Sequence, residues 1–424
     1  MKGKKLLISH VKNNILILGA NEIQSNSIKH IKSLGYRTIV CDRNKNSPGI
    51  KYADKFIEED FKNKEKLLKL VLNENINYIF PFNDIGVLTA NFLSDKLNLP
   101  SNGYLNSLKQ VMKFRMRKAC QRHGITQPYF FLINRLEDIY DKLDTVKFPF
   151  ILKPNFSGGG SRGVIKVNKY EEIESSYSFS RKYDLNKEKS VLLEEFISGI
   201  EIAIEGISNS YNDFHILTTS RKKKANTESR IDMEINYPFD KYTFNKQNIL
   251  MQCKNILFAL GHKKGLFHIE LKIDKDNQIY FIESGSRGGG GEILSSIIPL
   301  MTDIDIIKSQ IDINNKVFEM RHLKNKYSCY KFFNIKFGKL IKTVISSKIK
   351  TVSSLKKLNI LSKPGDVVGY FPNSLFRKDY CILFNENKRK LENDLILIDK
   401  YVEFQVEALD DVSNFNTKFI NYAK

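Results

Sequence analysis

The sequence of 424 residues lacks any apolar run of the roughly 18 residues that a transmembrane helix needs. Its N-terminus is basic, but His10 and Lys12 interrupt the apolar stretch that follows, so we expect no signal peptide. Cysteines are also scarce: the five are odd in number, far apart and without the spacing of metal ligands. These absences argue against a disulfide scaffold and predict reduced thiols in a cytoplasmic protein without a membrane partner.

Acidic residues are too few to balance the basic ones, with 47 Asp and Glu against 68 Lys and Arg and a formal net charge of +21. Such an excess can indicate a nucleic-acid or membrane partner. The lysines are scattered, however, and the tightest basic run is Arg221 to Lys224. The abundance of Lys, Ile and Asn is typical of an AT-rich genome. We therefore favour attraction of small anionic substrates and expect no nucleic-acid partner.

The dinucleotide motif G-x-G-x-x-G is missing as well. An apolar run, Ile15 to Ala20, a helix-like segment and a second strand, Tyr36 to Cys41, predict a β-loop-α-β unit. Further glycines would be expected where Asn21, Glu22 and Ser25 stand, which argues against NAD binding. Strands and helices continue to alternate up to about residue 100 and predict a small parallel α/β domain.

The segment Leu99 to Gly103 closes this domain. Within it, Asp84 follows a predicted strand and is expected to cap the helix that begins at Ile85, with a ligand contact at the strand's carboxyl end as the alternative. A basic helix, Ser107 to His123, comes next. Its basic side chains, most of them expected to be solvated, are Lys113, Arg115, Arg117 and Lys118.

The Walker motif G-x-x-x-x-G-K-[ST] is absent, but another glycine loop is present. An apolar strand, Phe148 to Pro154, carries Lys153 and leads into the glycine-rich loop 155–163 and a strand at Val164 to Val167. Backbone N–H groups of such a hairpin loop can fold over a triphosphate, with Lys153 beneath as a point charge. A plain flexible surface hairpin is the alternative for this loop taken alone.

A second hairpin is predicted from Phe267 to Ile273 and from Gln278 to Glu283, around a turn of Asp and Asn. Pairing of its strands brings Glu270 and Glu283 to one face, where two carboxylates repel each other unless a cation lies between them. Oxygen ligands of this kind suit Mg²⁺. The alternative is a solvated acidic hairpin, but the run that follows, Arg287 and four glycines, suits a loop that wraps phosphate or carboxylate oxygens.

Together these segments resemble the ATP-grasp superfamily, in particular its carboxylate–amine ligases and its biotin-carboxylase-like, carbamoyl-phosphate-synthase-like branch. The motifs that carry the resemblance are Lys113, Lys153 with its glycine hairpin, Glu194-Glu195-Phe196 with Gly199 and Glu201, Glu270 and Glu283 with Arg287, and the tail around Lys363 to Val367 and Arg377. Each motif is weak alone, whereas their order and spacing together are specific.

The resemblance implies a parallel α/β domain followed by an ATP-grasp fold of two α+β subdomains with a C-terminal extension. The expected parts are a Rossmann-like domain (1–104), a helical linker (105–145), a lid subdomain (146–206), a central subdomain with the metal site (207–315) and a C-terminal subdomain (316–424). Nucleotide would lie between the two subdomains, beneath a mobile lid formed by the 155–163 hairpin.

The resemblance also implies the site residues. Phosphates would contact Lys113, Lys153 and the lid residues Ser157, Gly158, Gly159, Gly160 and Ser161. Adenine would lie against Glu194, Glu195 and Phe196, and ribose against Glu201. Glu270 and Glu283 would hold Mg²⁺ or Mn²⁺, and Arg287 would act with Glu283 and Lys153 in catalysis. The family usually has Asn where this chain has Gly285, which leaves the number of metal ions open.

The implied function is an ATP-dependent ligase that joins a carboxylic acid to an amine through an acyl phosphate. The alternatives are a bicarbonate-activating carboxylase or carbamoyl-phosphate-like enzyme, and a nucleotide-binding scaffold without turnover. Substrate contacts are expected from Arg221, Arg230, Gly289 and Gly290. The oligomeric state is left open, and a homodimer is one candidate because dimers are common among similar proteins.

Overall fold

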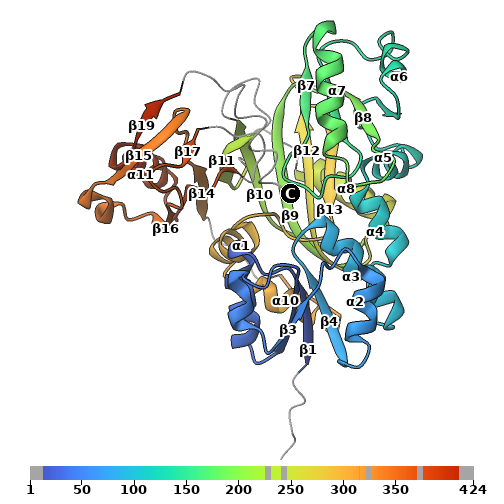
Figure 1. The fold of residues 1–424 in the computed structure, drawn as a ribbon, viewed down its shortest axis with the longest axis horizontal. Coiled ribbons are helices and arrows are strands. Elements are labelled where there is room, and N and C mark those ends of the chain that lie inside the picture. The colour runs from blue at the N-terminus through green and yellow to red at the C-terminus, as the bar shows by residue number, and fades with distance from the viewer. Residues whose placement is uncertain are drawn as a thin grey trace, which may run out of the picture.

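The computed structural model describes residues 13–224, 231–239, 246–314, 316–320, 326–369 and 376–409. These residues form four sheets, which Figure 1 shows as a parallel N-terminal sheet, a lid sheet, a long central sheet and a small C-terminal sheet. The described part of the chain contains no helix that is both long and apolar enough to cross a membrane.

The N-terminal sheet is parallel throughout and has the order β3-β2-β1-β4. Its elements are β1 (Asn14–Leu18), α1 (Glu22–Ser33), β2 (Arg37–Asp42), β3 (Lys55–Glu58), α2 (Lys64–Val71), β4 (Ile76–Pro81) and α3 (Asp84–Lys96). At the position of the missing glycines, Asn21 and Gln24 form a reciprocal capping box at the start of α1. The predicted parallel α/β domain is confirmed.

The single basic helix predicted from Ser107 to His123 is wrong. Two helices occur instead, α4 (Tyr104–Val111) and α5 (Lys113–Arg122), because Met112 between them has an extended backbone. The break makes Lys113 the first residue of α5, and its N–H donates to the carbonyl oxygen of Asn155 at 2.9 Å. The start of α5 is thereby fixed to the loop that follows Lys153.

The lid sheet is antiparallel, with the order β5-β8-β6-β7. Its elements are β5 (Phe130–Ile133), α6 (Glu137–Tyr140), β6 (Phe150–Pro154), β7 (Ile165–Val167), α7 (Ile173–Lys182) and β8 (Val191–Glu195). Phe150, Leu152 and Val167 pack with Ile173 and Tyr177 of α7, so α7 covers one face of the sheet. The predicted glycine hairpin between β6 and β7 is confirmed.

The central sheet has eight strands in the order β13-β12-β9-β10-β11-β14-β18-β16. Its strands are β9 (Ile200–Ser210), β10 (Asp213–Lys224), β11 (Asp232–Tyr237), β12 (Gly265–Ile273), β13 (Ile279–Gly285), β14 (Tyr327–Phe332), β16 (Leu355–Asn359) and β18 (Tyr380–Asn385). Helix α8 (Lys246–Ala259) packs on it, as do α9 (Ile298–Thr302) and α10 (Ile306–Asp312). Because β9 pairs with β10 and β12, the expected lid boundary at residue 206 falls inside a central strand.

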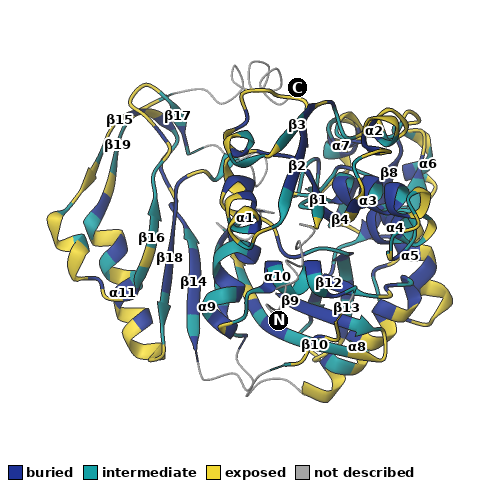
Figure 2. Ribbon diagram, turned by 90° about the horizontal axis from the view of Figure 1, so that it is seen from below, coloured by how far each residue is buried: buried dark blue, intermediate teal, exposed yellow. Residues whose placement is uncertain are grey.

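The C-terminal part is split between two sheets. Strands β14, β16 and β18 extend the central sheet, whereas β15 (Gly338–Ile345), β17 (Val367–Val368) and β19 (Val402–Ala408) form a three-stranded sheet beside α11 (Lys388–Tyr401). Strands β14 and β18 are largely buried, whereas Figure 2 shows β15, β19 and the outer side of α11 with exposed residues. The remaining short helices are η1 (Pro48–Tyr52), η2 (Tyr170–Glu172), η4 (Ile293–Ile297) and η5 (Ser347–Thr351).

Candidate nucleotide and metal site

Most residues that the resemblance implies for nucleotide and metal line one cavity between the lid sheet and the central sheet. Its walls come from β6 and β8, from β9, β10, β12 and β13, and from the start of α5. The predicted residues that line it are Lys113, Lys153, Ser157, Gly159, Ser161, Glu194, Glu195, Phe196, Glu201, Glu270 and Glu283. The fold therefore brings together segments that are far apart in the sequence.

The two candidate metal ligands lie opposite each other. Glu270 on β12 is the cross-strand partner of Glu283 on β13, as the hairpin pattern predicts. Each carboxylate contacts a lysine: Glu283 lies 2.9 Å from the Nζ of Lys113, and Glu270 contacts Lys222. Among the described residues, no group of three or more His, Cys, Asp or Glu forms a closed metal cage. Two carboxylates suit Mg²⁺, which commonly takes one or two protein carboxylates and fills its remaining coordination positions with phosphate oxygens and water.

Glu194 is buried and is held by two cations. Arg117 donates to both of its oxygens, at 2.8 and 3.3 Å, and the Nζ of Lys153 lies 2.7 Å away. Although burial opposes the charge, Arg117 and Lys153 lower the pKa of Glu194 to about 2. The expectation that Arg117 is solvated is wrong, since its side chain is only 1% exposed and also donates to the carbonyl oxygens of Phe281 and Ile282.

Lys153 is buried among both acidic and basic groups. Its burial lowers its pKa, and Arg117 and Lys113 lower it further, while Glu194 and Glu283 act in the opposite direction. An ammonium group placed in this way gains from added negative charge, which phosphate oxygens would provide.

Two lysines of β10, Lys222 and Lys224, contact carboxylates of the neighbouring strands β9 and β11. Lys222 and Lys224 both contact Glu201, at 3.1 Å each, and both contact Asp232. Side chains alternate along a strand, so the neighbouring Arg221 is exposed rather than directed at these carboxylates. Arg221 thus lies on the face of β10 opposite Lys222, and its substrate contact stays a prediction. Arg230 lies outside the described residues.

Asp84 does not cap its helix. Asn83 caps α3 by accepting from the N–H of Gly86 at 2.8 Å, and Asp84 instead accepts from the Nε of Arg287 at 2.7 Å. The capping prediction is therefore wrong, and the alternative, a ligand contact, stays a prediction. A Cβ atom added to Gly159 would lie 3.2 Å from the Oδ2 of Asp84, so the tip of the lid loop lies against this ion pair.

The glycine run after Arg287 is anchored by a residue that the sequence did not indicate. The N–H of Gly289 donates to the Oε2 of Glu205 at 2.9 Å, and the other oxygen of Glu205 lies 2.6 Å from the Nδ1 of His268. His268 also contacts Glu270, at 3.1 Å. Burial disfavours its positive charge, yet these carboxylates raise the pKa of His268 to about 9. The strand parity that placed His268 beside Glu270 was the available signal, whereas nothing distinguished Glu205 from other glutamates.

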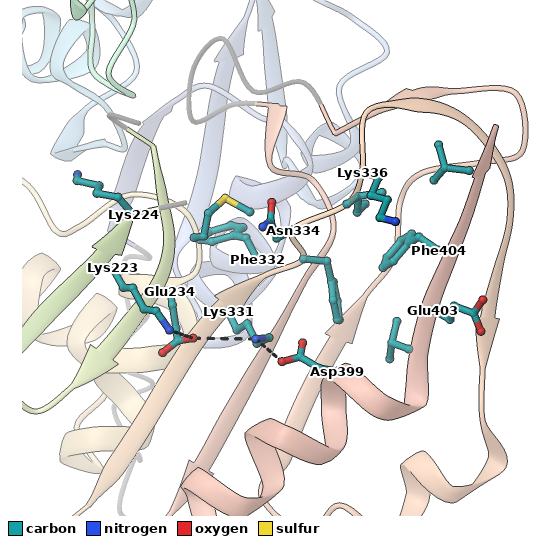
Figure 3. Close-up of a pocket in the computed structure, with 15 residues that line it drawn as sticks. Lys223, Lys224, Glu234, Lys331, Phe332, Asn334, Lys336, Asp399, Glu403 and Phe404 are labelled. Atoms are coloured by element: carbon teal, nitrogen blue, oxygen red, sulfur yellow. Dashed lines mark hydrogen bonds and ion pairs between the residues drawn. The ribbon is translucent and has the colours of Figure 1, made fainter. Parts of the chain in front are cut away.

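A larger cavity, of about 660 Å³, lies where β10, β11 and β14 meet β19 and α11. Figure 3 shows a row of charges along it, in which Lys331 lies between Glu234 at 4.0 Å and Asp399 at 3.0 Å. No residue predicted for the site lines this cavity, and Lys224 is shared with the smaller one. We assign the chemistry to the smaller cavity because it holds the opposed carboxylates.

Residues 146–296 match the family model of the ATP-grasp domain. The chain is 26% identical, over 66% of its own length and 71% of the relative, to a formate-dependent phosphoribosylglycinamide formyltransferase of Francisella tularensis subsp. tularensis. It is 21% identical, over 64% of its length and 69% of the relative, to an N5-carboxyaminoimidazole ribonucleotide synthase of Staphylococcus aureus.

Solved structures share the fold over almost the whole chain. An L-amino acid ligase from Bacillus licheniformis superposes with a TM-score of 0.77 at 19% identity, covering 94% of this chain and 99% of that protein. A phosphoribosylglycinamide synthetase from Anaerococcus prevotii gives a TM-score of 0.71 at 20% identity, covering 93% of this chain and all of that protein. The ATP-grasp resemblance and the mixed α/β architecture that the sequence predicts are confirmed, and the relatives are enzymes.

Proposed function

We propose that this chain, which contains an ATP-grasp domain, is an ATP- and Mg²⁺-dependent ligase that joins a carboxylic acid to an amine and releases ADP and phosphate. The observation that carries the proposal is the opposed pair Glu270 and Glu283, surrounded by Lys113, Lys153 and Lys222. Cations and metal-binding oxygens at one spot suit a triphosphate whose terminal phosphoryl group is transferred.

The reaction needs activation because a carboxylate has no leaving group. Transfer of the γ-phosphoryl group from ATP to a carboxylate oxygen breaks the β–γ phosphoanhydride bond, releases ADP and forms an acyl phosphate. The amine then attacks the acyl carbon, the C–O bond to phosphate breaks, and the nitrogen loses a proton. Mg²⁺ held by Glu270 and Glu283 would neutralise charge on the phosphate oxygens.

The chain's own residues would position and shield the reacting groups. Lys113 and Lys153 contact phosphate oxygens, and Arg287, oriented by Asp84, faces the transferred phosphoryl group or the acid's carboxylate. The lid loop 155–163 covers the site, which excludes water that would hydrolyse the acyl phosphate. The backbone and apolar atoms of 194–197 line the adenine end, because the carboxylate of Glu194 is already held by Arg117 and Lys153.

The relatives support this class of reaction through their names. One structural relative is named an L-amino acid ligase, and one sequence relative is named a formate-dependent formyltransferase. Amino acids and formate are both carboxylic acids. The similarity to a biotin carboxylase of Campylobacter jejuni, with a TM-score of 0.67, keeps bicarbonate as a second acid to test.

The test is ADP release with Mg²⁺-ATP across a panel of carboxylic acids, with hydroxylamine as the amine. We expect one class of acid to stimulate ADP release and to form a matching amount of hydroxamate. The Glu283→Gln variant should bind ATP and form no hydroxamate. Stimulation by bicarbonate alone would replace the ligase proposal with the carboxylase, and ATP binding without turnover for any acid would favour the scaffold.

A further inference from the structure

A continuous row of hydrogen bonds joins a metal ligand to the glycine run after Arg287. Glu270 contacts the Nε2 of His268 at 3.1 Å, and the Nδ1 of His268 contacts Glu205 at 2.6 Å. The second oxygen of Glu205 then accepts from the backbone N–H of Gly289 at 2.9 Å. Both ring nitrogens therefore face carboxylate oxygens, and the row crosses three elements: β12, β9 and the segment after β13.

We propose that His268 and Glu205 are positioning residues that couple the orientation of Glu270, at the metal, to the backbone of Gly289, at the acid-binding end. The proposal rests on the proposed function, because it assumes the metal site at Glu270 and Glu283. It assigns a role to His268, Glu205 and Gly289, none of which is expected to contact ATP. A shift of the glycine run on acid binding is transmitted to the metal ligand, and metal binding fixes the glycine run in return.

Burial makes this row stiff. Glu205 is 1% exposed and His268 is 9% exposed, so neither side chain can replace a lost partner with bulk water. Both oxygens of Glu205 are used, one by the imidazole and one by the backbone N–H. Displacement of one end therefore moves the other rather than being absorbed by solvent.

The contact at Glu270 fixes the carboxylate in one orientation. Lys222 and His268 both contact its Oε1 atom, so the donors converge on the same oxygen. Holding one oxygen from two sides directs the other oxygen of the carboxylate, as partners behind a metal ligand commonly do. Loss of such a partner typically weakens metal binding by about 10- to 100-fold.

The contact at Glu205 explains why residue 289 is glycine. A Cβ atom there would lie 2.5 Å from the Oε1 of Glu205 and 2.8 Å from Ile293, which is too close for any side chain. At Gly290, by contrast, an added Cβ atom would have no neighbour within 4 Å. Gly289 is buried against Glu205 and Ile293, whereas the adjacent Gly290 is exposed and meets neither, so Gly290 serves as the control.

The experiment measures Mn²⁺ binding by electron paramagnetic resonance in the presence of a non-hydrolysable ATP analogue. We expect Gly289→Ala to weaken Mn²⁺ binding by roughly tenfold or more, although Gly289 contacts neither Glu270 nor Glu283. Gly290→Ala should stay within about twofold of wild type. His268→Asn should weaken binding as Gly289→Ala does, and the double variant should be no weaker than His268→Asn alone, because both changes break the same row.

The proposal would be overturned if a folded Gly289→Ala protein kept its Mn²⁺ affinity. It would also be overturned if the loss of affinity in the double variant equalled the product of the losses in Gly289→Ala and His268→Asn. If Gly289→Ala does not fold, Glu205→Leu removes both acceptor oxygens and is measured instead, with the same two outcomes. Because the measurement needs no acid, its result is independent of the ligase assay. If Gly289→Ala weakens Mn²⁺ binding but no acid stimulates ADP release, the positioning role is supported and the ligase function is rejected. If an acid stimulates ADP release but the two substitutions act independently on Mn²⁺ affinity, the ligase function is supported and the positioning role is rejected.

Discussion

Arg117 shows how a single buried residue supports the site. It is 1% exposed, binds Glu194 through two hydrogen bonds and donates to two backbone carbonyl oxygens of β13. It therefore joins α5, the lid sheet and the strand that carries Glu283. Its loss would leave Glu194 with Lys153 as its remaining cationic partner in a buried place.

We predict that Arg117→Met lowers the free energy of unfolding by about 3 to 5 kcal/mol, the usual effect of removing one partner of a buried ion pair. Arg115, two residues earlier on the same helix, is exposed, and Arg115→Met should change stability by less than about 0.5 kcal/mol. Urea denaturation of both variants measures the difference. Equal midpoints for the two variants would show that Arg117 does not support the fold.

The pKa of Glu194 predicts a loss of stability in acid. Its folded pKa of about 2 lies below its ordinary value of 4.5, so its contribution is complete above about pH 4.5 and is lost as the pH falls toward 2. The difference corresponds to about 3 kcal/mol. Urea midpoints between neutral pH and about pH 3 should fall less steeply in Glu194→Gln than in wild type. Parallel profiles would contradict this assignment.

At the residue scale, the sequence indicated the groups that bear chemistry and missed the groups that hold them. Alternation along a strand was enough to place Glu270 opposite Glu283. The ion pair of Asp84 with Arg287 depends on the approach of two domains, which no local pattern encodes. Arg221 was singled out for its charge within a basic run, and the parity of β10 puts it on the face opposite Lys222.

At the element scale, the loop between β6 and β7 has a backbone conformation that requires glycine at several positions. Gly158, Gly159, Gly160 and Gly163 have φ between +70° and +90°, a region that other residues rarely adopt. The tip lies against Asp84, so the loop has to keep both its conformation and its contact. Its glycines therefore do more than provide flexibility.

We predict that Gly159→Ala lowers kcat/KM for ATP by on the order of tenfold to a hundredfold, because its Cβ atom would approach Asp84 and displace the closed loop. Gly35→Ala is the control. Its φ of +88° carries the same backbone strain as the φ of +90° at Gly159, but nothing lies within 4 Å of the added atom. Both variants should lose about 1 kcal/mol of stability. Steady-state kinetics that do not distinguish them would contradict a closing role for the loop.

Strands and helices with a regular hydrophobic periodicity agree with the sequence prediction, whereas the interruption between two helices was not predicted. The strands of both hairpins and the helix α8 lie where their patterns placed them. The break at Met112 was missed because the sequence around it favours a continuous helix, and the hydrogen bond from Lys113 to Asn155 stabilises the interruption. The order of strands in the central sheet joins β13 to β16 across eight strands, and local signals do not specify such pairings.

At the scale of the whole molecule, the charge of +21 should act on rates rather than on the fold. We predict that kcat/KM for ATP falls severalfold between about 0.05 M and about 0.5 M salt, while kcat changes little, because screening weakens attraction of an anionic substrate. A kcat/KM that is independent of salt would show that the excess charge does not steer substrate. Binding to nucleic acid, if detected in a gel shift, should disappear near physiological salt.

Activation of a carboxylate by phosphoryl transfer from ATP is the step on which the proposed function depends. The most direct measurement uses the acid found in the panel, labelled with ¹⁸O in its carboxylate, together with its amine and Mg²⁺-ATP. We predict that the released phosphate contains one ¹⁸O atom from the acid for each amide formed, and that Glu283→Gln forms neither amide nor labelled phosphate. Phosphate without label, in a reaction that forms amide, would contradict the acyl phosphate and with it the proposed role of the site.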